Sequence, residues 1–319
     1  MPDAGSGRVT IRDVARAAGV SHATVSRVIN GGRDVSTTTR RAVDRALKRT
    51  GYTPNAHARR LAGARPDVVA FLHCVQIERL FADPNINRLW LGCSRALGEQ
   101  GIMTILPIGN GQVDAALMFS ARAAEVADLA GRHLPLVACG LPAGHEDEVA
   151  YVTSDDRGGA RKMVSYLRER GRGRIATVTG PLDLPSGALR LAGYLDVVGA
   201  GDPALVAHGD YTYRSGLEAA ERLLRQAPDL DAIFAASDVM AAGVIEALDR
   251  AGKSIPGDVA VAGFDDAPVA SAVWPPLTTV HVQWDRHPGE LVRQLWRQLD
   301  GDEPSGVVLP VGITVRASA

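Results

Sequence analysis

Acidic residues directly follow several short apolar runs in the C-terminal four-fifths of the sequence, where they could bind a ligand. They form the pairs Asp155-Asp156, Ser237-Asp238 and Asp265-Asp266. Arg190 and Tyr211 lie between these pairs, in segments with the composition of loops. Carboxylates accept hydroxyl protons, a guanidinium donates a fork of hydrogen bonds, and an aromatic ring stacks on C–H faces. This combination predicts a site for a polyhydroxylated small molecule.

Two other interpretations of these acidic residues have to be weighed. An aspartate after a strand commonly caps the next helix, and that alternative stays open for each residue taken singly. Neighbouring aspartates on a strand point to opposite faces, so the pairs do not predict a metal site. The sequence also contains no Gly-x-Ser-x-Gly elbow, no phosphate-binding Gly-x-x-x-x-Gly-Lys and no HExxH. We therefore expect no catalytic residues, no metal and no cofactor.

The elements that would position these side chains alternate between strands and helices. Helical patterns separate most of the short apolar runs, which are typical of buried parallel strands. The runs are DVVAFLHC, IMTILPI, VDAALMF, LPLVACG, RIATVTG, AIFAASD, VAVAGFDD and LTTVHV. This order predicts a doubly wound α/β fold, in which ligands bind beyond the carboxyl ends of the strands.

The first 32 residues have a different pattern, that of two short helices joined by a glycine. Thr10 and Asp13 resemble a capping box, Gly19 ends the first helix, and Ser21 begins the second. Apolar residues at helical spacing then leave a polar outer face of short side chains with one arginine. Such a helix-turn-helix can enter the major groove of DNA. The outward residues are His22, Ala23, Ser26 and Arg27.

A third helix and a basic linker follow. Ser36 precedes the helical pattern TTTRRAVDRALKRT, which Gly51 ends, and Pro54 prevents that helix from continuing. Asn55 could cap a short helix over residues 56–62 that carries Arg59 and an exposed Leu61. So short a helix is unstable alone in water, but it could order on DNA and insert the leucine between base pairs. A flexible linker is the alternative.

Charge is divided unevenly along the 319-residue chain. Residues 1–65 carry 13 basic and four acidic side chains, a net charge of +9, whereas residues 66–319 carry 22 basic and 32 acidic ones, a net charge of −10. A basic segment attached to an acidic body suggests a module that binds a polyanion. Three cysteines, no apolar run long enough to span a membrane and no signal-peptide pattern favour a cytoplasmic location.

The first 65 residues resemble the DNA-binding headpiece and hinge of the lactose-repressor (LacI/GalR) family of bacterial transcription regulators. TIRDVARAAGVSHATVSRVIN and GYTPNAHARRLAG carry the resemblance. It implies that His22, Ala23 and Arg27 read bases in double-stranded operator DNA, and that Leu61 is the intercalating hinge leucine. The resemblance further implies backbone and positioning contacts for Ser21, Thr24, Ser26, Asn30, Ser36, Thr39, Tyr52 and Asn55.

The C-terminal body resembles the effector domain of the same family, through DDRGGARKMVSYLRERGRGRIATVTGP, AASDVMAAGVIEAL and VAVAGFDDAPVASAVWPPLTTV. The resemblance implies a periplasmic-binding-protein-like pair of lobes with a sugar or related metabolite between them. It divides the chain into a headpiece (1–52), a hinge (53–65) and an effector-binding domain (66–319). The first lobe is expected at about 66–168 and 284–305, and the second at about 169–281 and 306–319. The implied pocket residues are Asp156, Arg190, Tyr211, Ser237 and Asp265, with Phe81, Asp83 and Asn85 as further candidates.

The sequence departs from the family in two places. It ends without heptad leucines, so the resemblance implies a homodimer rather than a tetramer. Only GNGQ separates TILPI from VDAALMF, too few residues for the crossover helix that parallel neighbours usually need. Either the first lobe has lost a helix or residues are missing from the chain. The sequence therefore predicts a ligand-controlled regulator, with three alternatives: a DNA-binding regulator without effector response, a solute-binding protein, and an enzyme on the α/β scaffold.

Overall fold

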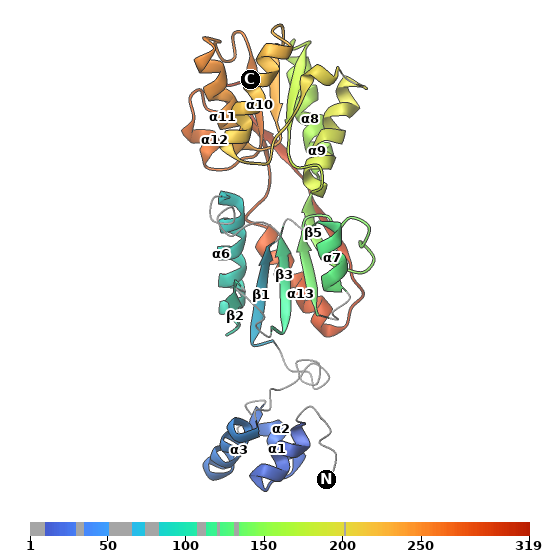
Figure 1. Cartoon of the computed structure of the whole chain (residues 1–319), viewed down its shortest axis with the longest axis vertical. Helices are drawn as coiled ribbons and strands as arrows, with labels where there is room; N and C mark the ends of the chain where they lie inside the picture. Colours follow the sequence, from blue (N-terminus) through green and yellow to red (C-terminus); the bar gives the residue numbers. More distant parts are fainter. Residues whose placement is uncertain are drawn as a thin grey trace, which may run out of the picture. The chain divides into compact units, whose positions relative to one another are not determined.

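The computed structural model describes residues 10–29, 35–50, 66–73, 83–106, 113–119, 122–130, 134–200 and 202–319. The chain divides into two compact units, Met1–Pro66 and Asp67–Ala319 (Figure 1). Within the described ranges, no helix has both the length and the apolar character needed to cross a membrane.

Three helices make up the described part of the N-terminal unit: α1 (Ile11–Ala18), α2 (His22–Ile29) and α3 (Thr37–Thr50). Apolar side chains at helical spacing meet in a small core, as the sequence predicts. That core consists of Val14, Ala15, Val25, Val28, Val43 and Ala46. Because the inward positions are apolar, the polar side chains of α2 are left on its outer face.

The ends of these helices are fixed by local hydrogen bonds. The Asp13 carboxylate accepts a hydrogen bond from the Thr10 backbone N–H at 2.9 Å. Gly19 ends α1 with a φ of +67°, a conformation that costs glycine little. The Ser21 hydroxyl accepts from the Thr24 N–H at 3.1 Å and so caps α2. Capping and the glycine turn therefore set the angle at which α2 leaves α1.

The first lobe of the C-terminal unit is built on a six-stranded sheet in the order β11-β5-β4-β3-β1-β2, and all its pairings are parallel. Its strands are β1 (Val68–His73), β2 (Met103–Ile105), β3 (Ala115–Phe119), β4 (Leu136–Cys139), β5 (Ala150–Ser154) and β11 (Gly306–Leu309). Its helices are α6 (Pro84–Gly98), α7 (Ala123–Ala130) and α13 (His287–Asp300).

Alternate residues of these strands face opposite layers. Phe71 and Phe119 stack at 3.7 Å between ring centroids on the face that α6 and α13 cover. Met118 faces the other side, where Val126 of α7 packs against the sheet. Among the described residues α7 is the sole helix on this second face.

The connection between β2 and β3 is short. Both strands pair with β1, on opposite sides of it, so β2 and β3 are not neighbours in the sheet. Nine residues, 106–114, join them, and the central six (107–112) lie outside the described residues. Ten residue steps reach about 33 Å at most, enough to return along the sheet without a helix. The chain thus has too few residues here for a crossover helix with its flanking loops.

The second lobe has its own six-stranded sheet, ordered β12-β10-β9-β8-β6-β7, in which only β12 is antiparallel to its neighbour. Its strands are β6 (Ile175–Thr179), β7 (Val206–His208), β8 (Ala232–Ala235), β9 (Ala260–Asp265), β10 (Thr278–His281) and β12 (Gly312–Thr314). Helices α8 (Asp156–Glu169) and α9 (Pro185–Val198) cover one face. Helices α10 (Tyr213–Gln226) and α11 (Asp238–Arg250) cover the other, and α12 (Val269–Ala272) contacts α11.

The chain passes between the lobes three times, and two crossings lie away from their expected positions. The first crossing is at Asp155 rather than near residue 168, because α8 packs against α9 and the second sheet. The last is at 310–311 rather than 305, because β11 pairs with β5 in the first sheet. The middle crossing, 282–286, is tied to the last one by a 2.9 Å hydrogen bond from Gln283 Nε2 to the Pro310 carbonyl oxygen.

Candidate functional site

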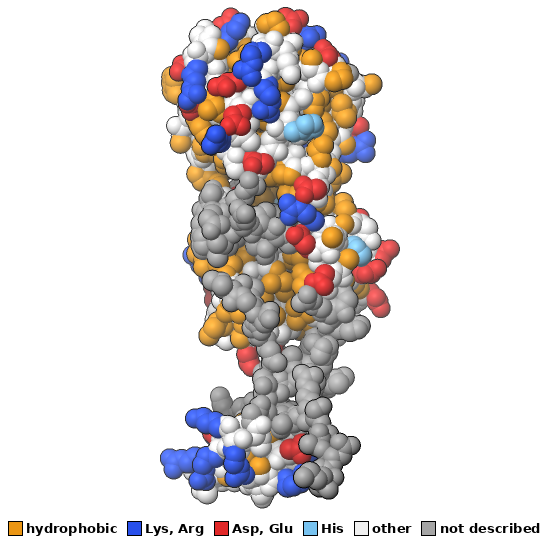
Figure 2. All heavy atoms as spheres, viewed as in Figure 1, with side chains coloured by type: hydrophobic (Ala, Val, Ile, Leu, Met, Phe, Trp, Pro, Cys, Tyr) orange, Lys and Arg blue, Asp and Glu red, His pale blue; other side chains and the backbone are white. Residues whose placement is uncertain are grey.

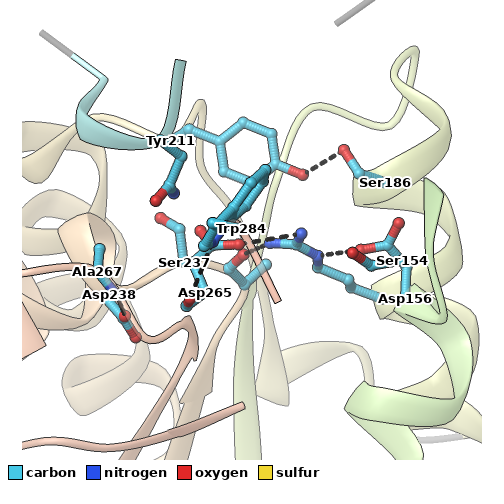
Figure 3. A network of polar contacts seen from close by, with 12 residues as sticks. Ser154, Asp156, Ser186, Tyr211, Ser237, Asp238, Asp265, Ala267 and Trp284 are labelled. Atoms are coloured by element: carbon cyan, nitrogen blue, oxygen red, sulfur yellow. Dashed lines mark hydrogen bonds and ion pairs between the residues drawn. The ribbon is translucent and has the colours of Figure 1, made fainter. Parts of the chain in front are cut away.

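Three charged side chains of the second lobe meet in one buried cluster (Figure 3). Asp156 is the first residue of α8, Arg190 lies in α9, and Asp265 ends β9. Arg190 Nε lies 2.8 Å from Asp156 Oδ1, and Arg190 Nη2 lies 3.2 Å from Asp265 Oδ1. Each of the three residues is only 6–7% exposed. The sequence therefore predicts the members of the cluster, although it places Arg190 in a loop and the structure places it in a helix.

Two further contacts hold the Arg190 guanidinium in place. Its Nη1 donates to the Ala236 carbonyl oxygen at 2.7 Å, and its carbon atom Cζ lies 3.6 Å from the centroid of the Phe264 ring. A guanidinium above an aromatic face gains a cation–π attraction that is stronger when water is excluded. The cation is thus fixed by four groups from α8, β9 and the end of β8.

Burial and neighbouring charges change the acidity of this cluster. Burial raises the pKa of Asp265 to about 7, since Arg190 lowers it less than burial and the charges of Asp83 and Asp156 raise it. Burial also raises the pKa of Asp156, again against the opposing effect of Arg190. For Arg190, burial lowers the pKa, but the charges of Asp265 and Asp156 outweigh burial and raise it. Arg190 therefore stays charged, while Asp265 titrates near neutral pH.

Tyr211 borders the same cluster from a loop. Its hydroxyl group forms a 2.9 Å hydrogen bond with the Ser186 hydroxyl, and its ring centroid lies 6.0 Å from the Arg190 guanidinium. Burial raises its pKa to about 12, so the phenol is protonated at neutral pH. The ring lies against the backbone of Gly180, where an added Cβ would lie 2.3 Å from a ring carbon. The residue has a positive φ of 70°, which non-glycine residues adopt rarely.

The helix-capping alternative holds for other polar residues of this region. The Asp155 carboxylate accepts from the Gly158 N–H at 2.8 Å, and the Ser237 hydroxyl accepts from the Met240 N–H at 3.2 Å. The Ser237 oxygen caps α11 and also lies beside the Arg190 cluster (Figure 3). Asp238 is fully buried and accepts from the Ala267 N–H and the Thr279 hydroxyl group. These contacts join the start of α11 to β10 and to the segment after β9, so they stabilise the fold of the second lobe.

Two residues that the sequence did not predict lie beside the cluster: Trp284 in the middle crossing and His287, the first residue of α13. Trp284 donates from Nε1 to the Asp265 carbonyl oxygen at 2.9 Å, and its ring lies 5.0 Å from that of His287. His287 is 1% exposed, and its Nε2 lies 3.2 Å from the Ser154 hydroxyl oxygen of the first lobe. Their only signal in the sequence is an aromatic residue and a histidine shortly after an apolar strand.

The first-lobe candidates are placed only in part. Phe81 lies outside the described residues. Asp83 caps α6 by accepting from the Asn85 N–H at 2.8 Å, and its charge contributes to the raised pKa of Asp265. Asn85, the remaining candidate, is 7% exposed in the first turn of α6. In the described residues, no group of histidine, cysteine and acidic side chains could hold a metal ion.

The N-terminal unit presents a separate candidate surface on α2. His22, Ala23 and Arg27 are exposed, whereas Thr24 and Ser26 are half-buried. The hydroxyls of Ser36 and Thr39 bond at 2.9 Å at the start of α3. Lys and Arg side chains gather over this unit in Figure 2. The exposed ones are Arg12, Arg16, Arg27, Arg41, Arg45, Lys48 and Arg49. The candidates Asn30, Tyr52, Asn55, Arg59 and Leu61 lie outside the described residues.

Two protein-family models match this chain, one near its N-terminus and one over its C-terminal half. Residues 10–55 match the bacterial regulatory proteins of the lacI family, and residues 164–319 match a periplasmic binding protein-like domain. The chain is 40% identical to the HTH-type transcriptional regulator CelR of Thermobifida fusca, over 98% of both chains. It is 34% identical to catabolite control protein A of Priestia megaterium, over 85% of this chain and 87% of that protein. The ribose operon repressor of Escherichia coli is 31% identical over the same shares.

Solved structures give the same result. A transcriptional regulator CelR–cellobiose complex superposes with a TM-score of 0.76 and 38% identity, over 98% of this chain and 100% of that one. The lac repressor dimer bound to operator and the anti-inducer ONPF superposes with a TM-score of 0.70 and 25% identity, over 98% and 99%. The CelR sequence alignment runs over 336 positions, 17 more than the 319 residues of this chain. That relative therefore has at least 17 residues without a counterpart here.

Proposed function

The chain belongs to the lacI family of bacterial regulatory proteins and is a DNA-binding transcriptional regulator, not an enzyme; from that premise we propose that a neutral saccharide bound beside Arg190 controls its binding to an operator. The protein would act as a repressor in the bacterial cytoplasm, where its DNA is.

The observation that carries the effector site is the buried Arg190 cluster. A guanidinium held between two carboxylates offers donors and acceptors in fixed positions, and Tyr211 and Trp284 add aromatic rings beside them. Sugars bind to such combinations because hydroxyl groups both donate and accept hydrogen bonds. The solved relative in complex with cellobiose favours a saccharide as the ligand. The proposed contacts are Asp156, Arg190, Tyr211, Ser237 and Asp265, with Asp83 and Phe81 from the first lobe.

The DNA site would be the exposed face of α2. Arg27 is the one long cationic side chain on this face and could donate two hydrogen bonds to a guanine, while His22 and Ala23 would read neighbouring bases. Hydroxyl groups at the helix starts, and that of Ser26 within α2, would contact phosphates, which fix the register of the headpiece on the duplex. These are Ser21, Thr24, Ser26, Ser36 and Thr39. The roles of Asn30, Tyr52, Asn55, Arg59 and Leu61 rest on the sequence resemblance.

A homodimer would bring two headpieces to a near-palindromic operator. Large apolar side chains exposed on the C-terminal unit support this proposal. Leu91 of α6 is 61% exposed, Met103 of β2 is 63% exposed, and Trp274 after α12 is 83% exposed. Figure 1 places α6 and α12 on the same side of this unit. Exposed apolar surface of this kind favours association with a partner, and the solved lac repressor relative is a dimer.

Effector control requires that the saccharide bind two arrangements of the lobes with unequal affinity. The three crossing segments would act as the pivot between the lobes, because Trp284 donates a hydrogen bond to the Asp265 carbonyl oxygen and the nearby His287 lies against Ser154 of the first lobe. A change in the lobe arrangement would then alter how the hinge and headpieces of a dimer engage the operator.

The test is selection of genomic fragments by the purified protein, followed by calorimetric titration of saccharides in the presence and absence of the selected DNA. We expect one family of near-palindromic fragments and a saccharide whose affinity differs at least several-fold between the two conditions. If the protein selected no DNA sequence over others at physiological salt, the proposal that it is a sequence-specific regulator would be refuted.

A second function has one specific observation in its favour. The short connection between β2 and β3 agrees with a first lobe reduced in this chain. A regulator that binds its operator without effector response would then be expected. Intact operator binding, together with no heat from any saccharide, would favour this alternative.

A further inference from the structure

Helix α3 carries three basic side chains on the face that is turned away from the core of the headpiece. Arg41, Arg45 and Lys48 are all exposed, and at 3.6 residues per turn they lie within about 60° of one another around the helix axis. Val43 and Ala46, on the opposite side of the helix, pack into the core with α1 and α2. We call these three residues the cationic stripe.

The charges of the cationic stripe have no acidic partners within the described part of the chain. None of its side chains forms an ion pair there, and Asp44, which lies beside the stripe, pairs with none of them. Arg41 and Arg45 are instead one turn apart, with Arg45 Nε at 3.3 Å from the Arg41 carbonyl oxygen. Like charges at this spacing destabilise a helix.

Helices of the C-terminal unit place opposite charges at the same spacing. Arg214 of α10 lies 2.8 Å from Glu218, and Arg293 of α13 lies 2.6 Å from Glu290. Those pairs are self-contained, because each cation has an anion within its own helix. The uncompensated charges of α3 are explained if their anions belong to another molecule.

The shape and composition of this face favour the backbone of a nucleic acid. The cationic stripe spans about 10 Å at 1.5 Å per residue, and one strand of duplex DNA carries a phosphate every 3.4 Å or so of its axis. Protein partners bind mainly through apolar or aromatic anchors, whereas phosphates require only cations. Around the stripe no apolar side chain of α3 is exposed, since the other exposed residues of this helix are Thr37, Thr38, Asp44 and Arg49.

The cationic stripe and the exposed face of α2 point away from a shared core. Val25 and Val28 turn inward from α2, as Val43 and Ala46 do from α3, so the outer faces of the two helices diverge. Basic side chains gather on the headpiece where Figure 1 places α3 (Figures 1 and 2). A duplex seated on α2 therefore leaves the stripe open to other DNA.

We propose that the cationic stripe of α3 binds the phosphates of a second DNA duplex while α2 holds the operator. This inference takes from the proposed function that α2 is the operator-binding surface. A homodimer would present two such stripes, so that one operator-bound dimer could hold a distant DNA segment beside the operator. The contact is independent of base sequence, because phosphates carry no sequence information.

The experiment measures whether an operator-bound protein captures a second duplex. A biotinylated near-palindromic duplex from the genomic selection is immobilised and saturated with full-length protein, and a short fluorescent duplex of unrelated sequence is then added. We expect capture whose affinity falls about 40-fold when the salt concentration rises about fourfold, since three phosphate contacts give a slope of about −2.7.

The triple variant Arg41→Gln, Arg45→Gln and Lys48→Gln removes the cationic stripe and keeps residues with a good helix propensity. It should stay on the immobilised operator and lose capture of the second duplex at least about tenfold. Its melting temperature should stay constant or rise, because like charges one turn apart are gone. Capture equal to that of the native protein would overturn the proposal.

The matched control removes the same charge from exposed positions of the C-terminal unit, through Arg161→Gln, Arg168→Gln and Arg225→Gln. Its capture should equal that of the native protein. Capture seen only when one operator half-site is scrambled would come from a free α2 and would overturn the proposal. So would binding of poly-L-glutamate in place of the duplex, which would assign the stripe to an acidic protein.

Failure of the underlying operator site would be visible separately. If the native protein holds the immobilised operator but captures no second duplex, only the role of the cationic stripe is wrong. If it does not hold the operator, recognition by α2 is wrong, and direct titration of the fluorescent duplex tests the stripe. The triple variant should then show a salt slope smaller by about 2.7 than the native protein, and equal slopes would overturn the stripe as a phosphate site.

Discussion

The headpiece and the C-terminal unit hold their candidate functional residues in opposite ways. In the headpiece the residues proposed to read bases lie on α2, an eight-residue helix, and all three of them, His22, Ala23 and Arg27, are exposed. In the C-terminal unit Asp156, Arg190 and Asp265 are buried and come from elements up to 109 residues apart. An exposed recognition residue can change without affecting the fold, whereas a member of a buried charge cluster cannot. Binding and stability should therefore separate in one region and be coupled in the other.

The largest effect is expected for Arg190→Ala. Removing the cation leaves two buried carboxylates unpaired, which costs about 3–5 kcal/mol of unfolding free energy, and saccharide affinity should fall at least about 30-fold. Urea unfolding and calorimetry measure the two quantities. Arg157→Ala is the control, since its ion pair with Asp196 is exposed and should contribute under about 1 kcal/mol. A native-like Arg190→Ala protein would show that burial and function are not coupled here.

The pH dependence of stability should be the next largest effect. Because burial raises the pKa of Asp265 from 3.8 to about 7, the folded protein retains a proton that the unfolded chain has lost between these values. The contribution of Asp265 to stability is therefore complete below pH 4 and is lost as pH rises through about 7. His287 acts in the opposite direction, since burial lowers its pKa.

The variant Asp265→Asn isolates the contribution of Asp265. The unfolding free energy of the native protein should fall between pH 5 and pH 8. This fall should be about 2–4 kcal/mol larger than the change in the variant over the same range. Identical pH profiles for the two proteins would show that Asp265 does not titrate in this window.

Arg27→Ala should separate binding from stability. Loss of a base contact should weaken operator binding by about 1–3 kcal/mol, while the unfolding free energy stays within about 0.5 kcal/mol. Arg16→Ala removes the same charge from an exposed position on α1 and should mainly lower non-specific affinity. Fluorescence anisotropy with operator and scrambled duplexes distinguishes these effects. Equal losses on both duplexes would remove Arg27 from base reading.

The smallest effect is expected for an ion pair that joins the two lobes. Arg122 before α7 donates to Asp183 of the second lobe at 2.5 Å, with 37% and 58% of the two side chains exposed. Because exposed pairs contribute under about 1 kcal/mol, Arg122→Ala should change saccharide affinity only a few-fold, and less at high salt. Arg214→Ala breaks a similar pair within α10 and should leave affinity unchanged. No change in either variant would exclude a role for the interlobe pair in closure.

Much of the fold could be predicted because its signals are local. All eight apolar runs form strands, and the three headpiece helices begin at the predicted residues. Four strands were not predicted. β5 contains the polar residues Tyr151, Thr153 and Ser154, β7 and β12 have three residues each, and β11 is a four-residue apolar segment, Gly306–Leu309. Because β5 was not predicted, the first crossing between the lobes was expected near residue 168, after α8, whereas it lies at Asp155, before α8.

The misplacement of Arg190 has a different cause. GALRLAGY looks like a loop because it contains Gly187 and Gly193, yet both glycines serve close packing within or beside α9. An added Cβ at Gly187 would lie 2.1 Å from the Pro181 carbonyl oxygen, and one at Gly193 would lie 2.2 Å from the Arg157 carbonyl oxygen. Close approach between distant segments cannot be inferred from local composition.

The sequence by itself determined the helix-turn-helix, the alternation of strands and helices, the division of charge and the residue types of the Arg190 cluster, since periodicity and capping act over a few neighbouring residues. Only the tertiary structure decided that Arg190 bridges Asp156 and Asp265 and that Trp284 and His287 join them. Those facts depend on strand order and on packing between segments far apart in the chain, and no local pattern encodes them.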